Sequence, residues 1–130
     1  MFFPVPLFPT ISSIKAGAYV AEDQDQHSNK TSYTYNMQSG QLQSMRTANN
    51  VTTNYSYKSN TDLLSSVSSG GVTVNYEYDN SNSRLNSITH NGFTYNLAYD
   101  TYGNLTQTTA GGHVLSTNTY GAYNGLLKQT

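Results

Sequence analysis

Asp79 and Asp100 are the two side chains that come closest to a catalytic arrangement, because they occupy equivalent positions in two similar stretches of the chain. If those stretches form neighbouring β-hairpins, the carboxyl groups lie two strands apart, at ~9.6 Å. Inverting glycoside hydrolases place their acid and base ~6.5–9.5 Å apart. However, neither residue is in an apolar setting that would raise one of the two pKa values. We therefore interpret both as turn residues at strand ends, and we predict that the protein is not an enzyme.

The sequence does not indicate a metal or cofactor site. His27, His90 and His113 are widely spaced, whereas a zinc site needs three or four ligands at a fitting geometry. The chain has no cysteine, which excludes thiolate ligands, disulfides and cysteine nucleophiles. No Gly-x-Ser-x-Gly elbow occurs, and no glycine-rich phosphate loop leads into a helix. We expect neither a metal nor a cofactor.

The bulk composition restricts the partners. Charged residues make up 10% of the 130 residues, the net charge is −1, and the Lys and Arg residues are scattered singly. Nucleic-acid-binding proteins carry a basic stripe or patch, so we expect no nucleic acid as a partner. No run of 18 apolar residues is present, so we expect no helical membrane-spanning segment. The 12 Tyr and 4 Phe residues in an otherwise polar chain favour β-structure over disorder.

The main feature of the sequence is a tyrosine that recurs at steps of 22, 21, 21 and 21 residues. A fixed period of this length indicates a repeat architecture. The residues before each of these tyrosines alternate between apolar and polar, as in 72–78, where Val and Tyr alternate with Thr, Asn and Glu. Such alternation predicts a strand with one buried and one solvated face. The recurring tyrosines, which we interpret as a structural ladder, are Tyr35, Tyr57, Tyr78, Tyr99 and Tyr120.

A return strand is predicted after each tyrosine. A polar turn follows the tyrosine, and a leucine then comes at a constant place: Leu42, Leu64, Leu85, Leu105 and Leu127. A second apolar residue usually stands three positions after the leucine, which does not fit plain alternation and predicts a β-bulge or bend. Gly-Gly or Asn-Gly then marks a short hairpin loop in several repeats. The predicted fold is all-β, with about five antiparallel hairpins of ~21 residues, or about ten strands, over residues 31–130.

Residues 76–105, YEYDNSNSRLNSITHNGFTYNLAYDTYGNL, combine the aromatic pair, the Asp, the turn, the Leu-x-x-Ile spacing and the Asn-Gly pair. In these features the chain, over roughly residues 33–130, resembles the YD repeat of Rhs-type proteins. Asn36, Lys58 and Gly121 stand in place of the Asp in other blocks, which implies degenerate repeats. The resemblance implies a fragment or reduced member of a family whose curved or spiralling sheets form a hollow shell. In bacteria such shells enclose a toxin, and related surface proteins are tied to adhesion and carbohydrate binding. An extracellular or cell-surface location is implied in the same way.

Residues 1–30 lie outside the repeats. Their start is apolar but interrupted by three prolines, which favours an extended segment over a signal peptide or a helix. Residues 21–30 hold three of the seven acids and are interpreted as a solvated linker. The apolar residues of segment 2–14 are candidates for an assembly segment that packs against the repeat sheet, in its own subunit or the next. They are Phe2, Phe3, Val5, Leu7, Phe8, Ile11 and Ile14.

The predicted sheet poses one question, because a sheet with one apolar face must cover that face. The sheet can close on itself, segment 2–14 can cover the face or pair with an edge, or a neighbouring chain can do so. The tyrosines serve either as packing groups or as a platform for sugars. We therefore expect a structural, encapsulating or self-assembling module, with carbohydrate binding and cell adhesion as the alternative.

Overall fold

The computed structural model describes residues 10–15, 17–121 and 127–129. The chain divides into two units, residues 1–72 and 73–130. The described residues of both units are all-β, and neighbouring strands within each unit pair antiparallel, as the sequence predicts. This part of the chain contains no helix with the length and hydrophobicity needed to cross a bilayer.

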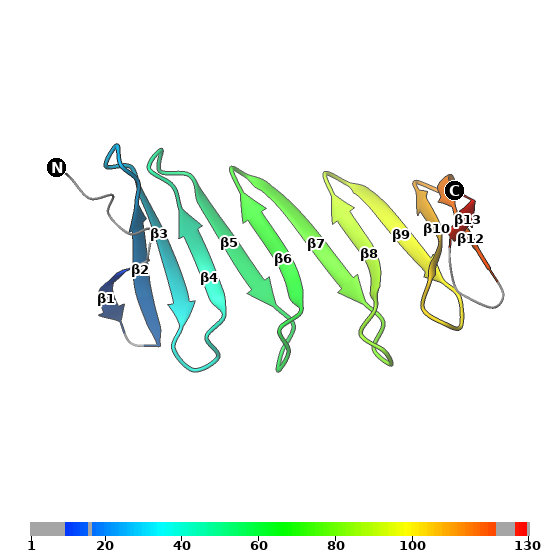
Figure 1. The fold of residues 1–130 in the computed structure, drawn as a ribbon, viewed down its shortest axis with the longest axis horizontal. Coiled ribbons are helices and arrows are strands. Elements are labelled where there is room, and N and C mark those ends of the chain that lie inside the picture. Colours follow the sequence, from blue (N-terminus) through cyan, green and yellow to red (C-terminus); the bar gives the residue numbers. More distant parts are fainter. Residues whose placement is uncertain (1–9, 16, 122–126, 130) are drawn as a thin grey trace. The chain divides into compact units, whose positions relative to one another are not determined.

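The first unit is a meander in which each strand pairs with the next one along the chain (Figure 1). Its strands are β1 (Thr10–Lys15), β2 (Ala18–Gln24), β3 (Lys30–Asn36), β4 (Leu42–Arg46), β5 (Thr52–Tyr57) and β6 (Leu64–Ser69). Strands β3 to β6 are the two hairpins of the first two repeats. Strands β1 and β2 precede the repeats and extend the same sheet of this unit.

The second unit is built in the same way. Its meander consists of β7 (Val72–Tyr78), β8 (Leu85–His90), β9 (Phe93–Tyr99), β10 (Leu105–Ala110) and β11 (His113–Thr117). Two short strands, β12 (Thr119–Tyr120) and β13 (Leu127–Gln129), pair with each other as a separate two-stranded sheet. The strand that the sequence predicts before Tyr120 is thus divided at Asn118 into β11 and β12.

A β-bulge occurs at the same place in the repeat hairpins β3–β4, β5–β6, β7–β8 and β9–β10, and it confirms the prediction made from the spacing of three. In the β3–β4 hairpin, Tyr35 lies opposite Leu42 but Thr34 lies opposite Ser44, so Gln43 is an extra residue. The extra residue places Leu42 and Met45 on one face of the sheet, although an unbulged strand would place them on opposite faces. The hairpins β5–β6, β7–β8 and β9–β10 have their register shift at the equivalent position.

The short loops also follow the prediction. Asn91 and Gly92 join β8 to β9 with φ values of 49° and 78°, and His90 pairs directly with Phe93. Gly111 and Gly112 join β10 to β11 with φ values of 56° and 81°. Two successive positive φ values are those of a type I′ turn, which matches the twist of the flanking strands.

Each unit presents one face rich in tyrosine. In the first unit we define the tyrosine face by the residues that the register places on one side of β3 to β6: Tyr33, Tyr35, Leu42, Met45, Tyr55, Tyr57, Leu64 and Val67. The other side carries small polar residues such as Ser44, Ser56 and Ser66. Among the described residues only Ala21 is buried, at 5% exposure, so most of the tyrosine face is half-buried by its own neighbours alone.

One interpretation of residues 1–30 needs revision. Residues 21–24 are not linker but belong to β2, which pairs with β3 along its whole length. The error arose because the acids Glu22 and Asp23 suggested a solvated loop, whereas the alternating residues Tyr19 and Ala21 contact the tyrosine-bearing strand β3. Only the turn between β2 and β3 is left of the predicted linker.

The predicted assembly segment is described only in part. Ile11 and Ile14 lie in β1, where their backbones pair with Ala21 and Tyr19 of β2. This pairing agrees with the alternative in which the segment joins a sheet edge in its own subunit. Phe2, Phe3, Val5, Leu7 and Phe8 lie outside the described residues.

Candidate functional site

The repeat acids are turn caps, as interpreted from the sequence. The Oδ1 atom of Asp79 accepts hydrogen bonds from the backbone N–H groups of Ser81 (2.8 Å) and Asn82 (3.2 Å). Asp100 accepts the N–H groups of Tyr102 and Asn104, both at 2.9 Å. Both carboxylates are therefore engaged within their own turns.

Asn36 caps the equivalent turn of the first repeat. Its Oδ1 atom accepts the N–H groups of Gln38 (2.8 Å) and Ser39 (3.1 Å). The cap therefore needs an acceptor oxygen and not a negative charge. This explains why the sequence can carry Asn or Asp at this place.

Hydrogen bonding also sets the charge state of these acids. A side-chain hydrogen bond from Ser81 holds the pKa of Asp79 below its usual value, and one from Asn104 does so for Asp100. Both groups are therefore charged at neutral pH, whereas a catalytic acid needs a raised pKa. Among the described residues, no group of three or more His, Cys, Asp or Glu is placed to hold a metal ion.

The most distinctive geometry lies between successive hairpins, at the end that carries the polar turns. The β4–β5 ladder stops at the pair Ser44/Asn54, although β5 continues to Tyr57. In the second unit the β8–β9 ladder stops at Ser87/Asn96, although β9 continues to Tyr99. In both places regular pairing ends at the residue next to the bulge, and the ladder does not continue on the turn side. We call these two places the open joints.

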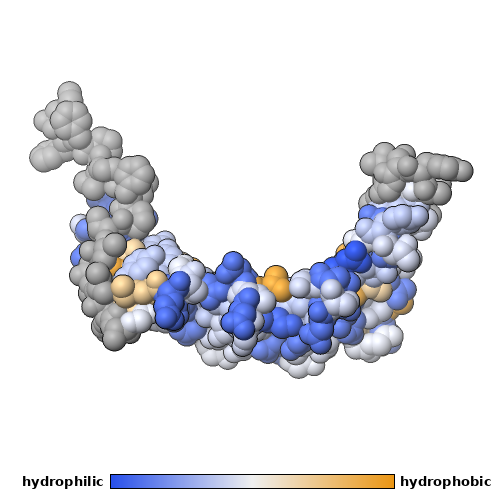
Figure 2. Space-filling model, turned by 90° about the horizontal axis from the view of Figure 1, so that it is seen from below, coloured by the Kyte–Doolittle hydropathy of each residue, from blue (hydrophilic) through white to orange (hydrophobic). Residues whose placement is uncertain are grey.

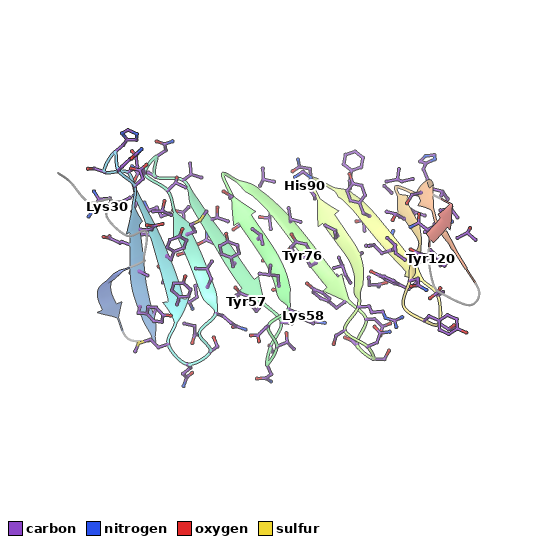
Figure 3. The ribbon with its side chains drawn as sticks, in the orientation of Figure 1. Lys30, Tyr57, Lys58, Tyr76, His90 and Tyr120 are labelled. Atoms are coloured by element: carbon purple, nitrogen blue, oxygen red, sulfur yellow. The ribbon has the colours of Figure 1, made fainter. Side chains whose placement is uncertain are left out.

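A tyrosine hydroxyl bridges each open joint. Tyr57 donates its hydroxyl hydrogen to the backbone carbonyl of Leu42, at 2.8 Å, and Tyr99 donates to the carbonyl of Leu85, at 2.7 Å. Figure 3 shows Tyr57 in β5, close to Lys58 and the turn. Tyr57 and Tyr99 thus each lie opposite the leucine of their own hairpin and bond the leucine of the preceding one. Burial raises the pKa of the Tyr57 hydroxyl, so the group stays protonated and able to donate.

At a third joint, between β10 and the β11–β12 strand, two side chains donate hydrogen bonds to the same carbonyl. The Tyr120 hydroxyl bonds the Leu105 carbonyl at 2.8 Å, and the side-chain amide of Asn118 bonds the same oxygen at 3.0 Å. The Asn118 backbone N–H also donates to the carbonyl of Thr106, at 2.8 Å. Asn118 stands at the first position of the repeat pair, where the β4–β5 joint has Tyr55 and the β8–β9 joint has Leu97.

At each of the two open joints, the residue that precedes the repeat leucine makes a contact across the joint. The Gln41 amide donates to the carbonyl of Thr61 (2.7 Å) and to the carboxylate of Asp62 (2.9 Å) in the next turn. At the equivalent place in the second unit, the Arg84 guanidinium lies over the Tyr99 ring, 5.9 Å from its centre. This is within the range of a cation–π interaction. The sequence interpretation missed both residues, although their constant position before the leucine could have identified them.

Shallow grooves open at both joints. The groove at the β4–β5 joint has a volume of about 480 Å³, and that at the β8–β9 joint about 370 Å³. Their linings use equivalent repeat positions, but Tyr55 and Ser56 of the first correspond to Leu97 and Ala98 of the second. Figure 2 looks at the turn ends of the strands, where the surface is mostly hydrophilic. The first groove therefore combines aromatic rings with amides, hydroxyls, Lys58 and Asp62.

The predicted ladder residues are therefore brought together as pairs. Tyr35, Tyr57, Tyr78, Tyr99 and Tyr120 each lie opposite the leucine of their own repeat, namely Leu42, Leu64, Leu85, Leu105 and Leu127. The sequence predicted that these tyrosines act in packing, but it did not predict the hydroxyl bridges. A scan of the sequence against protein-family models found no match, and a search of the curated proteins found none either.

Proposed function

We propose that this protein is a non-catalytic structural module, an encapsulating or self-assembling β-repeat of the Rhs/YD type. The observation that carries this proposal is the recurring joint, in which a tyrosine hydroxyl bonds the leucine carbonyl of the preceding hairpin. The repeat tyrosines Tyr57, Tyr99 and Tyr120 thus hold successive hairpins together. The repeat acids likewise cap turns. A location outside the cell or on its surface, and a curved sheet as part of a larger shell, are included in the proposal.

Removal of one whole repeat tests the proposal. In a repeat protein, stability is approximately a sum of unit and neighbour terms, so units can be removed without loss of the fold. Deletion of residues 58–78 joins Tyr57 to Asp79 and keeps the order of tyrosine, turn and leucine. We expect this shortened chain to keep a β-sheet circular dichroism spectrum and a cooperative unfolding transition. Deletion of half as many residues, 58–68, breaks the register and serves as the control that should unfold.

Carbohydrate binding is the second candidate, and the β4–β5 groove favours it. The groove presents Tyr55 and Tyr57 beside Gln43, Lys58 and Asp62, a combination of ring faces and polar groups suited to sugars. Glycan-array binding that is lost on Tyr55→Ala would support this function. The control is Leu97→Ala, at the equivalent position of the second groove, which should leave that binding unchanged. Array binding by neither the native chain nor its variants would leave only the structural proposal.

A further inference from the structure

No second layer of described residues from the first unit covers the tyrosine face of that unit. An antiparallel sheet with one apolar face is stable when another layer covers that face. Of the residues whose burial the structure describes, only Ala21 is buried. The tyrosines Tyr33, Tyr35, Tyr55 and Tyr57 are half-buried, so a covering layer would bury more apolar area.

We propose that this face packs against the same face of a second copy of the chain, forming a two-layer sheet sandwich. The inference rests on the proposed structural function and deepens it by naming the partner. The charge on the face supports self-association, because Asp23 is the only charged side chain that the register of β2 to β6 places there. Two copies can therefore meet without opposing rows of like charge.

Three polar side chains on this face, those of Tyr57, Thr53 and Ser69, are already hydrogen-bonded within the sheet. The Tyr57 hydroxyl donates to the Leu42 carbonyl, and the hydroxyls of Thr53 and Ser69 bond each other at 3.0 Å. Covering a polar group costs free energy mainly when the group is left without a partner. A second apolar layer can therefore cover these groups at low cost.

The size of the face also favours a second copy over residues 1–9. Strands β2 to β6, five strands at ~4.8 Å and each ~20 Å long, give a flat area of roughly 480 Å² per copy. Two copies together bury ~960 Å² before side-chain relief is counted, near the ~1,000 Å² that a specific interface needs. Nine residues in extended form reach ~30 Å but cover the width of about one strand. They can cover at most a small part of the face.

Solution mass of matched variants tests the proposal. The full chain of 14.3 kDa should sediment as a dimer of twice that mass. Val67→Lys places a charge on the tyrosine face, opposite Tyr55, and should give a monomer. Ser66→Lys, on the same strand but the opposite face, should remain a dimer. A monomeric native chain at its highest soluble concentration overturns the proposal, as does an equal loss of mass in both variants.

Cross-linking keeps the proposal testable if Val67→Lys fails to fold. The chain has no cysteine, so a single introduced thiol can be cross-linked only between copies. With a short bis-maleimide, Val67→Cys should give covalent dimers in high yield, and Ser66→Cys should give few. Equal yields from the two variants overturn the proposal. A native monomer that becomes a dimer only after residues 1–9 are removed also overturns it, because the segment then covers the face. Either outcome would overturn only the dimer, because the whole-repeat deletion tests the proposed structural function separately.

Discussion

Within the first unit, strands β2 and β3 are held together differently from strands β4 and β5. β2 and β3 stay in register from Gln24/Lys30 to Ala18/Asn36, up to the turn end. β4 and β5 pair only from Arg46/Thr52 to Ser44/Asn54. The difference lies in Gln43, the bulge residue of β4, because a bulge bends its strand and interrupts the ladder. β2 has no such shift in its pairing with β3.

The repeat tyrosine takes a different role on each side of this difference. At the regular contact, Tyr35 stacks on Tyr19, with ring centres 5.0 Å apart and an interplanar angle of 16°. At the open joint, Tyr57 uses its hydroxyl to bond the Leu42 carbonyl. The same residue type therefore acts through its ring where pairing is complete and through its hydroxyl where pairing stops.

Deletion of Gln43 should have the largest effect, since it removes the bulge that creates the joint. The change shifts Met45 from the tyrosine face to the polar face. Loss of a core methionine costs about 2–5 kcal/mol, and because Met45 is half-buried we expect the low end, about 2 kcal/mol. Urea denaturation followed by circular dichroism measures this loss. Gln43→Ala keeps the residue count and should change the free energy of unfolding by less than about 0.5 kcal/mol. Equal losses in the two variants would contradict the role assigned to the bulge.

Tyr19→Leu should weaken the regular contact. The substitution removes the aromatic stack on Tyr35 but keeps an apolar residue in β2. Stacked aromatic pairs contribute about 0.5–1.5 kcal/mol beyond area burial, so we expect a loss of about 1 kcal/mol in urea denaturation. Tyr102→Leu is the control, because Tyr102 is 85% exposed. No difference between these two variants would show that the stack does not hold the contact.

Tyr120→Phe should have a smaller effect than the same change at an open joint. The Leu105 carbonyl also accepts the amide of Asn118, so it keeps a partner when the hydroxyl is removed. We expect a loss of a few tenths of a kcal/mol. The double variant Tyr120→Phe with Asn118→Ala leaves the carbonyl without both donors and should lose more than the sum of the single changes. Strict additivity in the double-mutant cycle would refute this sharing.

Asp79→Asn should change the acid dependence of stability more than stability itself. The pKa of Asp79 is held below 3.8 by the Ser81 hydrogen bond. A carboxyl with a lower pKa in the folded state adds stability that is complete above the unfolded pKa and is lost as the pH falls through the folded pKa. Thermal unfolding between about pH 2 and 6 should therefore fall less steeply for Asp79→Asn than for the native chain. An unchanged slope would contradict the cap assignment.

The sequence predicted the parts of this molecule that depend on local pattern. Alternation gave the strands, the spacing from Leu42 to Met45 gave the bulge, and the Asn91-Gly92 pair gave a tight turn. The open joints were not predicted, because the end of a ladder depends on how far two strands diverge after a bulge. β2 was missed in part because its acids resemble those of a loop, while its partner β3 decides its structure.

The central claim is that the tyrosine hydroxyl, and not only its ring, holds successive hairpins together at the open joint. Urea denaturation of Tyr57→Phe beside Tyr35→Phe tests it most directly. Tyr57→Phe should lose about 1 kcal/mol, the typical net contribution of a hydrogen bond. Tyr35→Phe keeps the ring that stacks on Tyr19 and should stay within about 0.5 kcal/mol of the native chain. Equal stability of the two variants would contradict the claim.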